Sequence, residues 1–286
     1  MTLLHKYMAK YVNTDIGNNP KTGIRKYCRT SKRGAGMDRK NKRIVILDTN
    51  IDALTARETV DVVEQYVIKK EPLHLMGVNA DKINMLNENK RLKEIVNGCG
   101  VINADGISVI LAGRFLGKAL PERVAGIDLM QDLIDLCAKR GYKIYLLGAK
   151  EEIVKRVAEI LKEKYKGLNI VGFHNGYFKE DRWFEIKEEI EAKQPDFVFV
   201  GITSPLKEYL VDYLQGQGLN CVFMGVGGSF DVISGAIPRA PEWMQRMNLE
   251  WLFRVMQEPR RLFKRYFVGN WKFLMLLMKE KRKLKR

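Results

Sequence analysis

The sequence is poor in the residues that build metal and disulfide sites. Its 286 residues include only three histidines and four cysteines, and no two cysteines have Cys-x-x-Cys spacing. We therefore expect no Cys/His zinc site, and isolated cysteines favour the reducing cytoplasm. No apolar run reaches the roughly 18 residues that a membrane-spanning helix requires, and the N-terminus lacks the apolar block of a signal peptide. We expect neither a spanning helix nor an export signal.

Three phosphate-binding signatures are also missing. The chain has no Gly-x-Gly-x-x-Gly motif, no P-loop and no Asp-x-Asp. These absences argue against a dinucleotide-dependent dehydrogenase, against a P-loop enzyme, and against the usual carboxylate pair for a metal that bridges a diphosphate. If a nucleotide sugar binds, cationic side chains and helix N-termini must neutralise its phosphates, so we expect no metal and no cofactor.

Positive charge is concentrated at the two ends of the chain. The formal net charge is +16, and residues 1–43 and 254–286 each carry +10, which leaves −4 for residues 44–253. Such a balance suggests nucleic acid or an anionic membrane as partner. Because the basic segments flank an acidic core and form no stripe on a known reader fold, we favour the membrane and expect no nucleic-acid binding. A nucleic-acid-binding module is the alternative.

Short apolar runs alternate with helical patterns from residue 44 onward, which is typical of βα units. We expect strands at residues 44–47, 73–78, 100–103, 143–147, 169–173, 197–201 and 221–226. We expect helices at residues 55–69, 80–96, 107–115, 127–140, 150–165, 181–193, 206–215 and 230–234. Thr55-Ala-Arg-Glu58 has the pattern of a capping box. The predicted fold class is α/β: a Rossmann-like, mostly parallel sheet with helices on both faces, over residues 44–241.

Both ends of the chain lie outside this pattern. Residues 1–43 lack apolar periodicity, and we expect a basic, disordered extension whose first 36 residues are dispensable or form a basic arm. Residues 242–286 alternate basic and large apolar residues in two amphipathic helical stretches, 243–259 and 260–277, which favours an appendage on anionic lipid. The alternative is a solvated helix packed on its own domain.

Glycines gather at the expected strand ends, where parallel α/β sheets bind their ligands. The densest group is Gly225-Val-Gly-Gly-Ser-Phe-Asp231. In Gly201-Ile-Thr-Ser-Pro205, proline at a helix start exposes N–H groups to an anion, and the nearby Lys207 adds charge for a phosphate. The residues assigned to a nucleotide-sugar site are Gly148, Gly201, Ser204, Gly225, Gly227, Gly228 and Asp231.

Two further strand ends carry an amide and a carboxylate. Asn79 follows an apolar run and starts a helix, as an N-cap or as a pocket residue. Asp105 stands before Gly106 at the mouth of a buried strand. A carboxylate held there partly out of water is suited to remove a proton from a sugar hydroxyl. Capping of the next helix explains Asp105 equally well.

A basic cluster near the C-terminus offers charge for a leaving group or for lipid. Its members are Arg254, Arg260, Arg261, Lys264 and Arg265. On one continuous helix, Arg254, Arg261 and Arg265 share a face, because they are seven and four residues apart. The alternative is a basic stripe that faces solvent or lipid. One stripe can also bind both the lipid and the substrate phosphate.

Taken together, these residues resemble the bacterial WecG/TagA/CpsF glycosyltransferase family over about residues 44–275. The matching elements are Val78-Asn-Ala80, Asn103-Ala-Asp-Gly-Ile107, Pro121-Glu-Arg-Val-Ala-Gly-Ile-Asp-Leu129, Leu146-Leu-Gly148, Gly172-Phe-His-Asn-Gly-Tyr-Phe178, Gly225-Val-Gly-Gly-Ser-Phe-Asp231, Arg239-Ala-Pro-Glu-Trp243 and Leu249-Glu-Trp-Leu-Phe-Arg-Val-Met-Gln-Glu-Pro-Arg-Arg261. So many motifs in one order make the match highly specific.

The resemblance implies a metal-independent, inverting glycosyltransferase. It implies transfer of a hexose or N-acetylhexosamine from a UDP-sugar to a polyprenyl-diphosphate-linked sugar at the cytoplasmic face of the cell membrane, in polysaccharide or teichoic acid synthesis. By resemblance Asp105 is the base and Asn79 lies in its pocket. The appendage brings Arg254 and Arg261 over the site, and Lys264 or Arg265 fills a third basic position. One base and two or three cations suffice for inversion with departure of UDP.

Two residues depart from the family pattern. Gly77 stands where relatives that use N-acetylmannosamine have Thr, and Lys207 stands where they have Gln. Both adjoin the expected donor pocket, so the donor sugar stays open between N-acetylmannosamine, its uronic acid, glucose and another hexose. A non-catalytic membrane scaffold is a further alternative, and an amphipathic appendage also allows a homo-oligomer.

Overall fold

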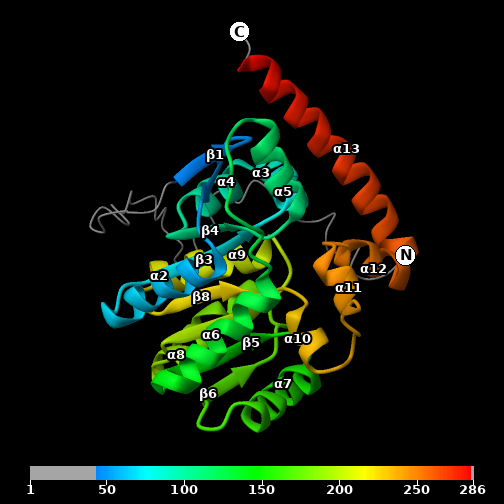
Figure 1. Cartoon of the computed structure of the whole chain (residues 1–286). Helices are drawn as coiled ribbons and strands as arrows, with labels where there is room; N and C mark the ends of the chain where they lie inside the picture. Colours follow the sequence, from blue (N-terminus) through cyan, green and yellow to red (C-terminus); the bar gives the residue numbers. More distant parts are fainter. Residues whose placement is uncertain (1–42, 285–286) are drawn as a thin grey trace. The chain divides into compact units, whose positions relative to one another are not determined.

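The structure, a computed structural model, describes residues 43–284 (Figure 1). Residues 1–42 and 285–286, and the side chains of Arg261 and Arg265, lie outside the described part. The basic extension expected at residues 1–43 therefore falls outside the described residues, except for Arg43. All the described residues belong to one compact unit.

The centre of the fold is a six-stranded sheet in which every neighbouring pair is parallel. Its strand order is β4-β3-β8-β7-β5-β6. The strands are β3 (Leu73–Val78), β4 (Val101–Ala104), β5 (Lys143–Gly148), β6 (Asn169–His174), β7 (Phe197–Gly201) and β8 (Val222–Gly225). The strands expected from residue 73 onward are thus confirmed to within one residue at each end, and so is the α/β fold class.

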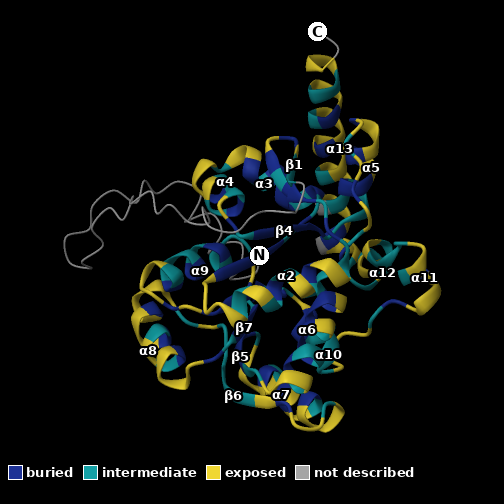
Figure 2. Cartoon of the chain, turned by 60° about the vertical axis from the view of Figure 1, so that its left-hand side comes forward, coloured by how far each residue is buried: buried dark blue, intermediate teal, exposed yellow. Residues whose placement is uncertain are grey.

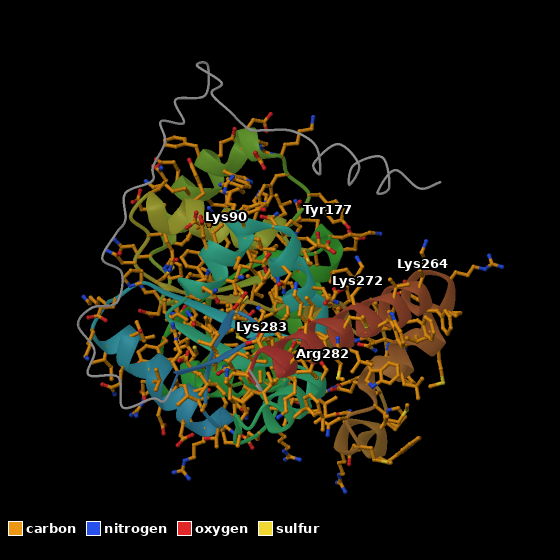
Figure 3. All side chains as sticks on the ribbon, turned by 90° about the horizontal axis from the view of Figure 1, so that it is seen from above. Lys90, Tyr177, Lys264, Lys272, Arg282 and Lys283 are labelled. Carbon is orange, nitrogen blue, oxygen red and sulfur yellow. The ribbon has the colours of Figure 1, made fainter. Side chains whose placement is uncertain are left out.

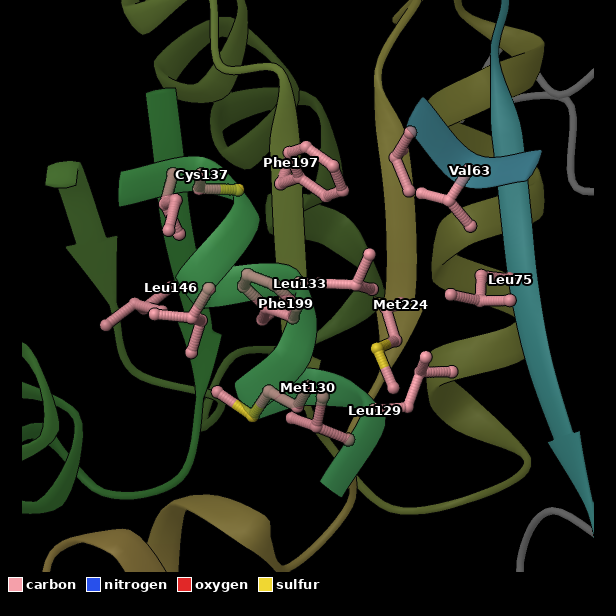
Figure 4. Close-up of a cluster of buried hydrophobic side chains, with 14 of the residues drawn as sticks. Val63, Leu75, Leu129, Met130, Leu133, Cys137, Leu146, Phe197, Phe199 and Met224 are labelled. Atoms are coloured by element: carbon pink, nitrogen blue, oxygen red, sulfur yellow. The ribbon is translucent and has the colours of Figure 1, made fainter. Parts of the chain in front are cut away.

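Helices cover both faces of this sheet. One face carries α2 (Ala56–Ile68), α6 (Gly126–Arg140) and α7 (Glu151–Lys164), and the other carries α3 (Ala80–Glu88), α4 (Lys90–Asn97), α5 (Ile107–Phe115), α8 (Trp183–Lys193) and α9 (Leu206–Gly216). Neighbouring side chains of a strand point to opposite faces, so Leu75 packs in the first layer and Met76 in the second. In Figure 4, Leu133 of α6 lies among the strand residues Phe199 and Met224 of the first layer. These buried layers hold the strand ends in place.

The strand order creates a topological switch point between β5 and β7. From β5 the chain runs outward through α7 to β6, whereas from β7 it runs the other way through α9 to β8. The two strands pair in register up to Gly148 and Gly201. Ligands of open α/β sheets bind outside the carboxyl ends of strands at such a point. The edge that ends in Gly148, Gly201 and Gly225 is therefore the first place to seek a site.

The strand expected at residues 44–47 does not join the parallel sheet. β1 (Arg43–Ile46) pairs antiparallel with β2 (Thr49–Asp52), a strand that the sequence pattern did not predict. Leu47 and Asp48 connect them with φ of 51° and 57°, the left-handed pair typical of a two-residue hairpin turn. The residues from Asp48 to Asn50 are polar and have the pattern of a loop, so the second strand was not predicted.

The single helix expected at residues 80–96 is wrong. α3 ends at Glu88 and α4 begins at Lys90, because Asn89 has an extended backbone and its side chain accepts a 2.9 Å hydrogen bond from the N–H of Leu92. An Asn N-cap inside an apolar-periodic segment restarts the helix. By contrast, the capping box at the start of α2 is confirmed.

Three helices follow residue 241. They are α11 (Glu242–Arg246), α12 (Glu250–Gln257) and α13 (Pro259–Lys283). The helix expected at residues 243–259 is thus interrupted, and Glu258, with φ of −131°, separates α12 from α13. The expectation that Arg254 shares one helix face with Arg261 and Arg265 is therefore wrong, because Arg254 lies on a different helix.

α13 packs along α3. Nδ2 of Asn84 on α3 donates a 2.7 Å hydrogen bond to the carbonyl oxygen of Gly269, and Phe273 and Leu277 are buried in the layer that contains α3. Along α13, buried and half-buried residues alternate with exposed ones, so one face of the helix stays open (Figure 2). None of the helices in residues 43–284 is long and apolar enough to cross a membrane.

Candidate active site

Asp105 follows β4 and is held at three points. Its N–H donates a 2.9 Å hydrogen bond to the carbonyl oxygen of Val78, and its own carbonyl oxygen accepts a 3.0 Å bond from Nε of Arg123. Oδ1 accepts a 2.8 Å bond from the N–H of Gly126, the first residue of α6. Among the described residues, Oδ2 accepts no hydrogen bond, and it lies 3.8 Å from the position of a Cβ atom on Gly77. One carboxylate oxygen is therefore fixed and the other is available to a proton.

Asn79, at the end of β3, lies beside Gly106, the residue that follows Asp105. A Cβ atom on Gly106 would lie only 2.9 Å from Cβ of Asn79, so the ends of β3 and β4 touch. The N-cap interpretation of Asn79 is confirmed, since its Oδ1 accepts a 3.0 Å hydrogen bond from the N–H of Lys82. The corresponding interpretation of Asp105 is wrong: Gly106 is the N-cap of α5, and Asp105 binds the start of α6 instead. The fold thus brings the two residues together.

A buried ion pair lies where α3 and α9 begin. The ammonium of Lys82 contacts Oε1 of Glu208 at 2.5 Å and donates to the hydroxyl of Ser204. That hydroxyl in turn donates a 2.8 Å hydrogen bond to Oε1. Lys207 adds a second ammonium 3.8 Å from the same oxygen. Ser204, expected in the nucleotide-sugar site, therefore has its hydroxyl engaged within the protein.

The surrounding cations keep Glu208 ionised although it is fully buried. Burial raises the pKa of a carboxyl, but the charges of Lys207 and Lys82 and the hydrogen bonds from Lys82 and Ser204 outweigh burial, so the pKa of Glu208 lies below its ordinary value. Burial also lowers the pKa of Lys82, which the Glu208 charge offsets only in part. Two ammoniums against one carboxylate leave one positive charge near the ends of β7 and β8.

The glycines at the switch point allow close packing. Gly148 has φ of +137°, and a Cβ atom there would lie 2.5 Å from the carbonyl carbon of Gly201. A Cβ atom on Gly201 would in turn lie 2.5 Å from the ring of Phe230. Side chains at these positions would push β5, β7 and the following α10 (Ser229–Ile233) apart. Gly148 and Gly201 therefore shape this edge of the sheet through its backbone.

The loop after β8 is more open. The side chain of Lys207 lies over Gly225, with Cε 2.9 Å from the position of a Cβ atom. Gly227 has φ of +53° and no atom within 4 Å of its Cβ position, and the Cβ position of Gly228 is 3.7 Å from Oδ2 of Asp231. Of the residues assigned to the nucleotide-sugar site, Gly225 lies directly under the Lys207 side chain.

The cations expected from the appendage are only partly described. Arg254 is exposed on α12, and Arg260 is exposed at the start of α13. Lys264, also on α13, is exposed as well (Figure 3). The side chains of Arg261 and Arg265 lie outside the described part. Within residues 43–284, no group of three or more His, Cys, Asp or Glu side chains is placed to hold a metal ion.

Sequence comparison decides the class of protein. The glycosyl transferase WecG/TagA/CpsF family profile matches residues 44–286. The chain belongs to this glycosyltransferase family. One relative is an N-acetylglucosaminyldiphosphoundecaprenol N-acetyl-beta-D-mannosaminyltransferase of Bacillus spizizenii, 33% identical over 174 residues, which cover 61% of this chain and 67% of the relative. The resemblance carried by the motifs is thereby confirmed.

Three charged residues of the candidate site, Arg123, Lys82 and Glu208, did not follow from sequence patterns. Arg123 lies within the family motif from Pro121 to Leu129, so a signal for it was present in the sequence. Lys82 and Glu208 are 126 positions apart and carry no local signal. Only the folded chain, in which the starts of α3 and α9 meet, brings this pair together.

Proposed function

We propose that this glycosyltransferase moves a hexose or N-acetylhexosamine, of the N-acetylmannosamine type, from a UDP-sugar to a polyprenyl-diphosphate-linked sugar. Its product would enter cell-surface polysaccharide or teichoic acid. The name of the Bacillus spizizenii relative supports this acceptor and this sugar. The observation that carries the proposal is the Asp105 carboxylate, with Oδ1 fixed by the first N–H of α6 and Oδ2 accepting no hydrogen bond from the described residues.

In this mechanism Asp105 is the general base. Oδ2 takes the proton from the acceptor hydroxyl as that oxygen attacks the anomeric carbon. The bond between the anomeric carbon and the diphosphate oxygen breaks on the opposite side, and UDP leaves with the electron pair. Attack from the opposite side inverts the anomeric configuration. Asn79, whose strand end touches Gly106, would orient the sugar.

The leaving diphosphate needs positive charge as it departs. Lys207 supplies it from the sheet edge, where the Lys82, Lys207 and Glu208 group keeps one excess positive charge. Arg254, Arg261 and Arg265 would add charge from the appendage. Such preorganised cations stabilise a leaving group without a metal. Gly225, Gly227, Gly228 and Asp231 would hold the nucleotide beside Lys207.

The acceptor's lipid explains the open face of α13. Phe263, Phe267 and Trp271 are spaced four apart on that face and are 60%, 68% and 64% exposed. Lysines flank this apolar stripe, including Lys264 and Lys272 (Figure 3). Basic residues beside exposed aromatic ones favour the surface of an anionic membrane. We place the enzyme at the inner face of the cell membrane.

A donor screen tests the proposal. The full chain is incubated with a short-chain prenyl-diphosphate-N-acetylglucosamine acceptor and single UDP-sugars, with EDTA in a parallel series. Mass spectrometry detects the product, and NMR assigns its anomeric configuration. We expect transfer of an N-acetylmannosamine-type sugar, inverted and insensitive to EDTA. Absence of transfer from every UDP-sugar contradicts the proposal and favours a non-catalytic scaffold.

A further inference from the structure

Arg123 joins the candidate base to the C-terminal appendage. While its Nε donates to the carbonyl oxygen of Asp105, Nη1 donates a 2.9 Å hydrogen bond to Oδ1 of Asn248. Nη2 forms a 2.5 Å ion pair with Oε2 of Glu250, at the start of α12. Each of the three guanidinium nitrogens therefore has a partner: Nε the backbone carbonyl of Asp105, and Nη1 and Nη2 side chains of the appendage. An arginine held in a fork of this kind has a fixed orientation.

Glu250 is also held from its other side. Oε1 accepts a 3.2 Å hydrogen bond from Nε of Arg239, and Nη2 of Arg239 forms a 2.7 Å ion pair with Asp128. Asp128 lies in the first turn of α6, the helix whose first N–H binds the Asp105 carboxylate. The contacts thus form a closed ring from Asp105 through Arg123, Glu250, Arg239 and α6 back to Asp105.

We propose that Glu250 is a positioning residue for the transfer reaction: it fixes Arg123 and α6 around Asp105, so that docking of α12 sets the orientation of the base. This inference rests on the proposed function, because it names how the same site is assembled. Glu250 is the ring's only member on α12, and among residues 43–284 it is the one carboxylate paired with the Arg123 guanidinium. Without it, the appendage keeps only the neutral Asn248 contact to Arg123.

The charge balance of the ring explains why a carboxylate is needed. Arg123 and Glu250 are 18% and 16% exposed, so neither charge is well solvated. Burial raises the pKa of Glu250, but the hydrogen bond and charge of Arg123 and the charge of Arg239 outweigh it, so the pKa lies below its ordinary value. A glutamine in its place would leave Arg123 partly buried without its counter-ion, and the guanidinium would have to move. Its hydrogen bond to Asp105 would move with it.

The matched pair of variants is Glu250→Gln and Glu242→Gln. Glu242 pairs with Arg246 on α11 at 3.3 Å, and both side chains are more than four-fifths exposed, so the same change there removes a solvated pair. For Glu250→Gln we expect kcat to fall roughly ten- to hundredfold, since a misplaced catalytic group costs about that much, with KM for the UDP-sugar within about twofold. We expect Glu242→Gln to match the parent in both constants.

A double-mutant cycle that combines Glu250→Gln with Arg123→Lys tests whether the two residues act on kcat through their shared contact or independently. Because both changes break the same contact, the combined loss in kcat should fall clearly below the product of the single losses. Glu250→Asp keeps the charge and shortens the side chain, so we expect it to restore part of the kcat lost in Glu250→Gln. If Glu250→Gln does not fold, the inference is tested with Glu250→Asp instead. For this variant we expect a lower kcat than the parent and an unchanged KM.

Limited trypsin proteolysis provides a readout that needs no activity. Glu250→Gln should be cut several-fold faster than the parent within residues 239–260, and Glu242→Gln should not. Parental kcat and KM in Glu250→Gln, a rise in KM without loss of kcat, or multiplicative losses in the cycle would overturn the inference. A parent that transfers no sugar contradicts the proposed function instead, and proteolysis then decides alone whether Glu250 holds α12.

Discussion

The backbone nitrogen of Gly126 lies 2.8 Å from Oδ1 of Asp105, so the first N–H of α6 holds one oxygen of the candidate base. A helix N-terminus stabilises negative charge, and here it also fixes the plane of the carboxylate. The second oxygen lies 3.8 Å from the Cβ position of Gly77. The orientation of the base is thus set by a helix that begins 21 residues later in the chain.

Asp105→Asn should fold like the parent. The amide oxygen of asparagine accepts the same hydrogen bond from Gly126, and only the charge at the N-terminus of α6 is lost, which is worth about 0.3–1 kcal/mol. Thermal unfolding followed by circular dichroism measures this difference. A loss above about 3 kcal/mol would mean that Asp105 serves mainly to hold the fold together.

The buried pair of Lys82 and Glu208 should dominate stability at the sheet edge. Removal of one partner leaves a buried charge unpaired, so Glu208→Gln and Lys82→Met should each lose about 3–5 kcal/mol. The double variant Lys82→Met/Glu208→Gln should lose clearly less than the sum of the two single losses, because neither member of the buried pair remains charged. Urea unfolding of the four proteins gives the coupling free energy. Additive losses would show that the two residues act independently.

Stability should also depend on pH through Glu208. Its pKa is lowered in the folded protein from an ordinary value of 4.5, so the folded state favours the ionised form. This contribution is fully present above the unfolded pKa and is lost as pH falls through the lowered folded value. The stability gap between the parent and Glu208→Gln should therefore be constant near neutral pH and should shrink only below pH 4.5. A gap that shrinks between pH 8 and 6 would contradict this assignment.

Two glycines should respond very differently to alanine. Gly148→Ala combines a φ of +137° with a Cβ atom 2.5 Å from the backbone of Gly201, and we expect a loss of about 3 kcal/mol or more. Gly227→Ala has a left-handed φ of +53° but open space, and we expect about 1–2 kcal/mol. Chemical denaturation measures both. Equal losses would mean that crowding at the switch point is unimportant.

The exposed aromatic residues of α13 should govern vesicle binding. Replacement of Phe263, Phe267 and Trp271 by serine should weaken co-sedimentation with phosphatidylglycerol vesicles by roughly tenfold or more, because their apolar area no longer enters the interface. Phe184→Ser on α8, where the side chain is 58% exposed, is the control and should bind like the parent. Parental vesicle binding by the triple variant, or tight DNA or RNA binding at physiological salt, would favour the alternative of a nucleic-acid-binding protein.

The sequence predicted most of the fold because its signals were local. The apolar runs of β3 and β7 and the capping box of Thr55 and Glu58 each lie within a few residues. The errors arose where a polar residue changed the local geometry. The turn at Leu47 and Asp48 produced a hairpin, and Asn89 divided one expected helix into two.

The candidate site was less predictable because its contacts join distant segments. Motif matching placed Asp105 and Asn79 together, and the fold brings their strand ends into contact. The partners that orient Asp105 lie 18 and 21 residues further along the chain. Glu250 reaches the site across 127 residues through Arg123. No local pattern reports ion pairs over such separations, because they exist only after the layers pack.

The rate of sugar transfer by the parent and by Asp105→Asn, measured side by side at saturating UDP-sugar and acceptor in EDTA, tests the central claim most directly. The proposed mechanism predicts transfer by the parent and a rate at least about a hundredfold lower for a folded Asp105→Asn, as expected for loss of a general base. Transfer by Asp105→Asn at the parent rate would contradict the assignment of Asp105 as the base.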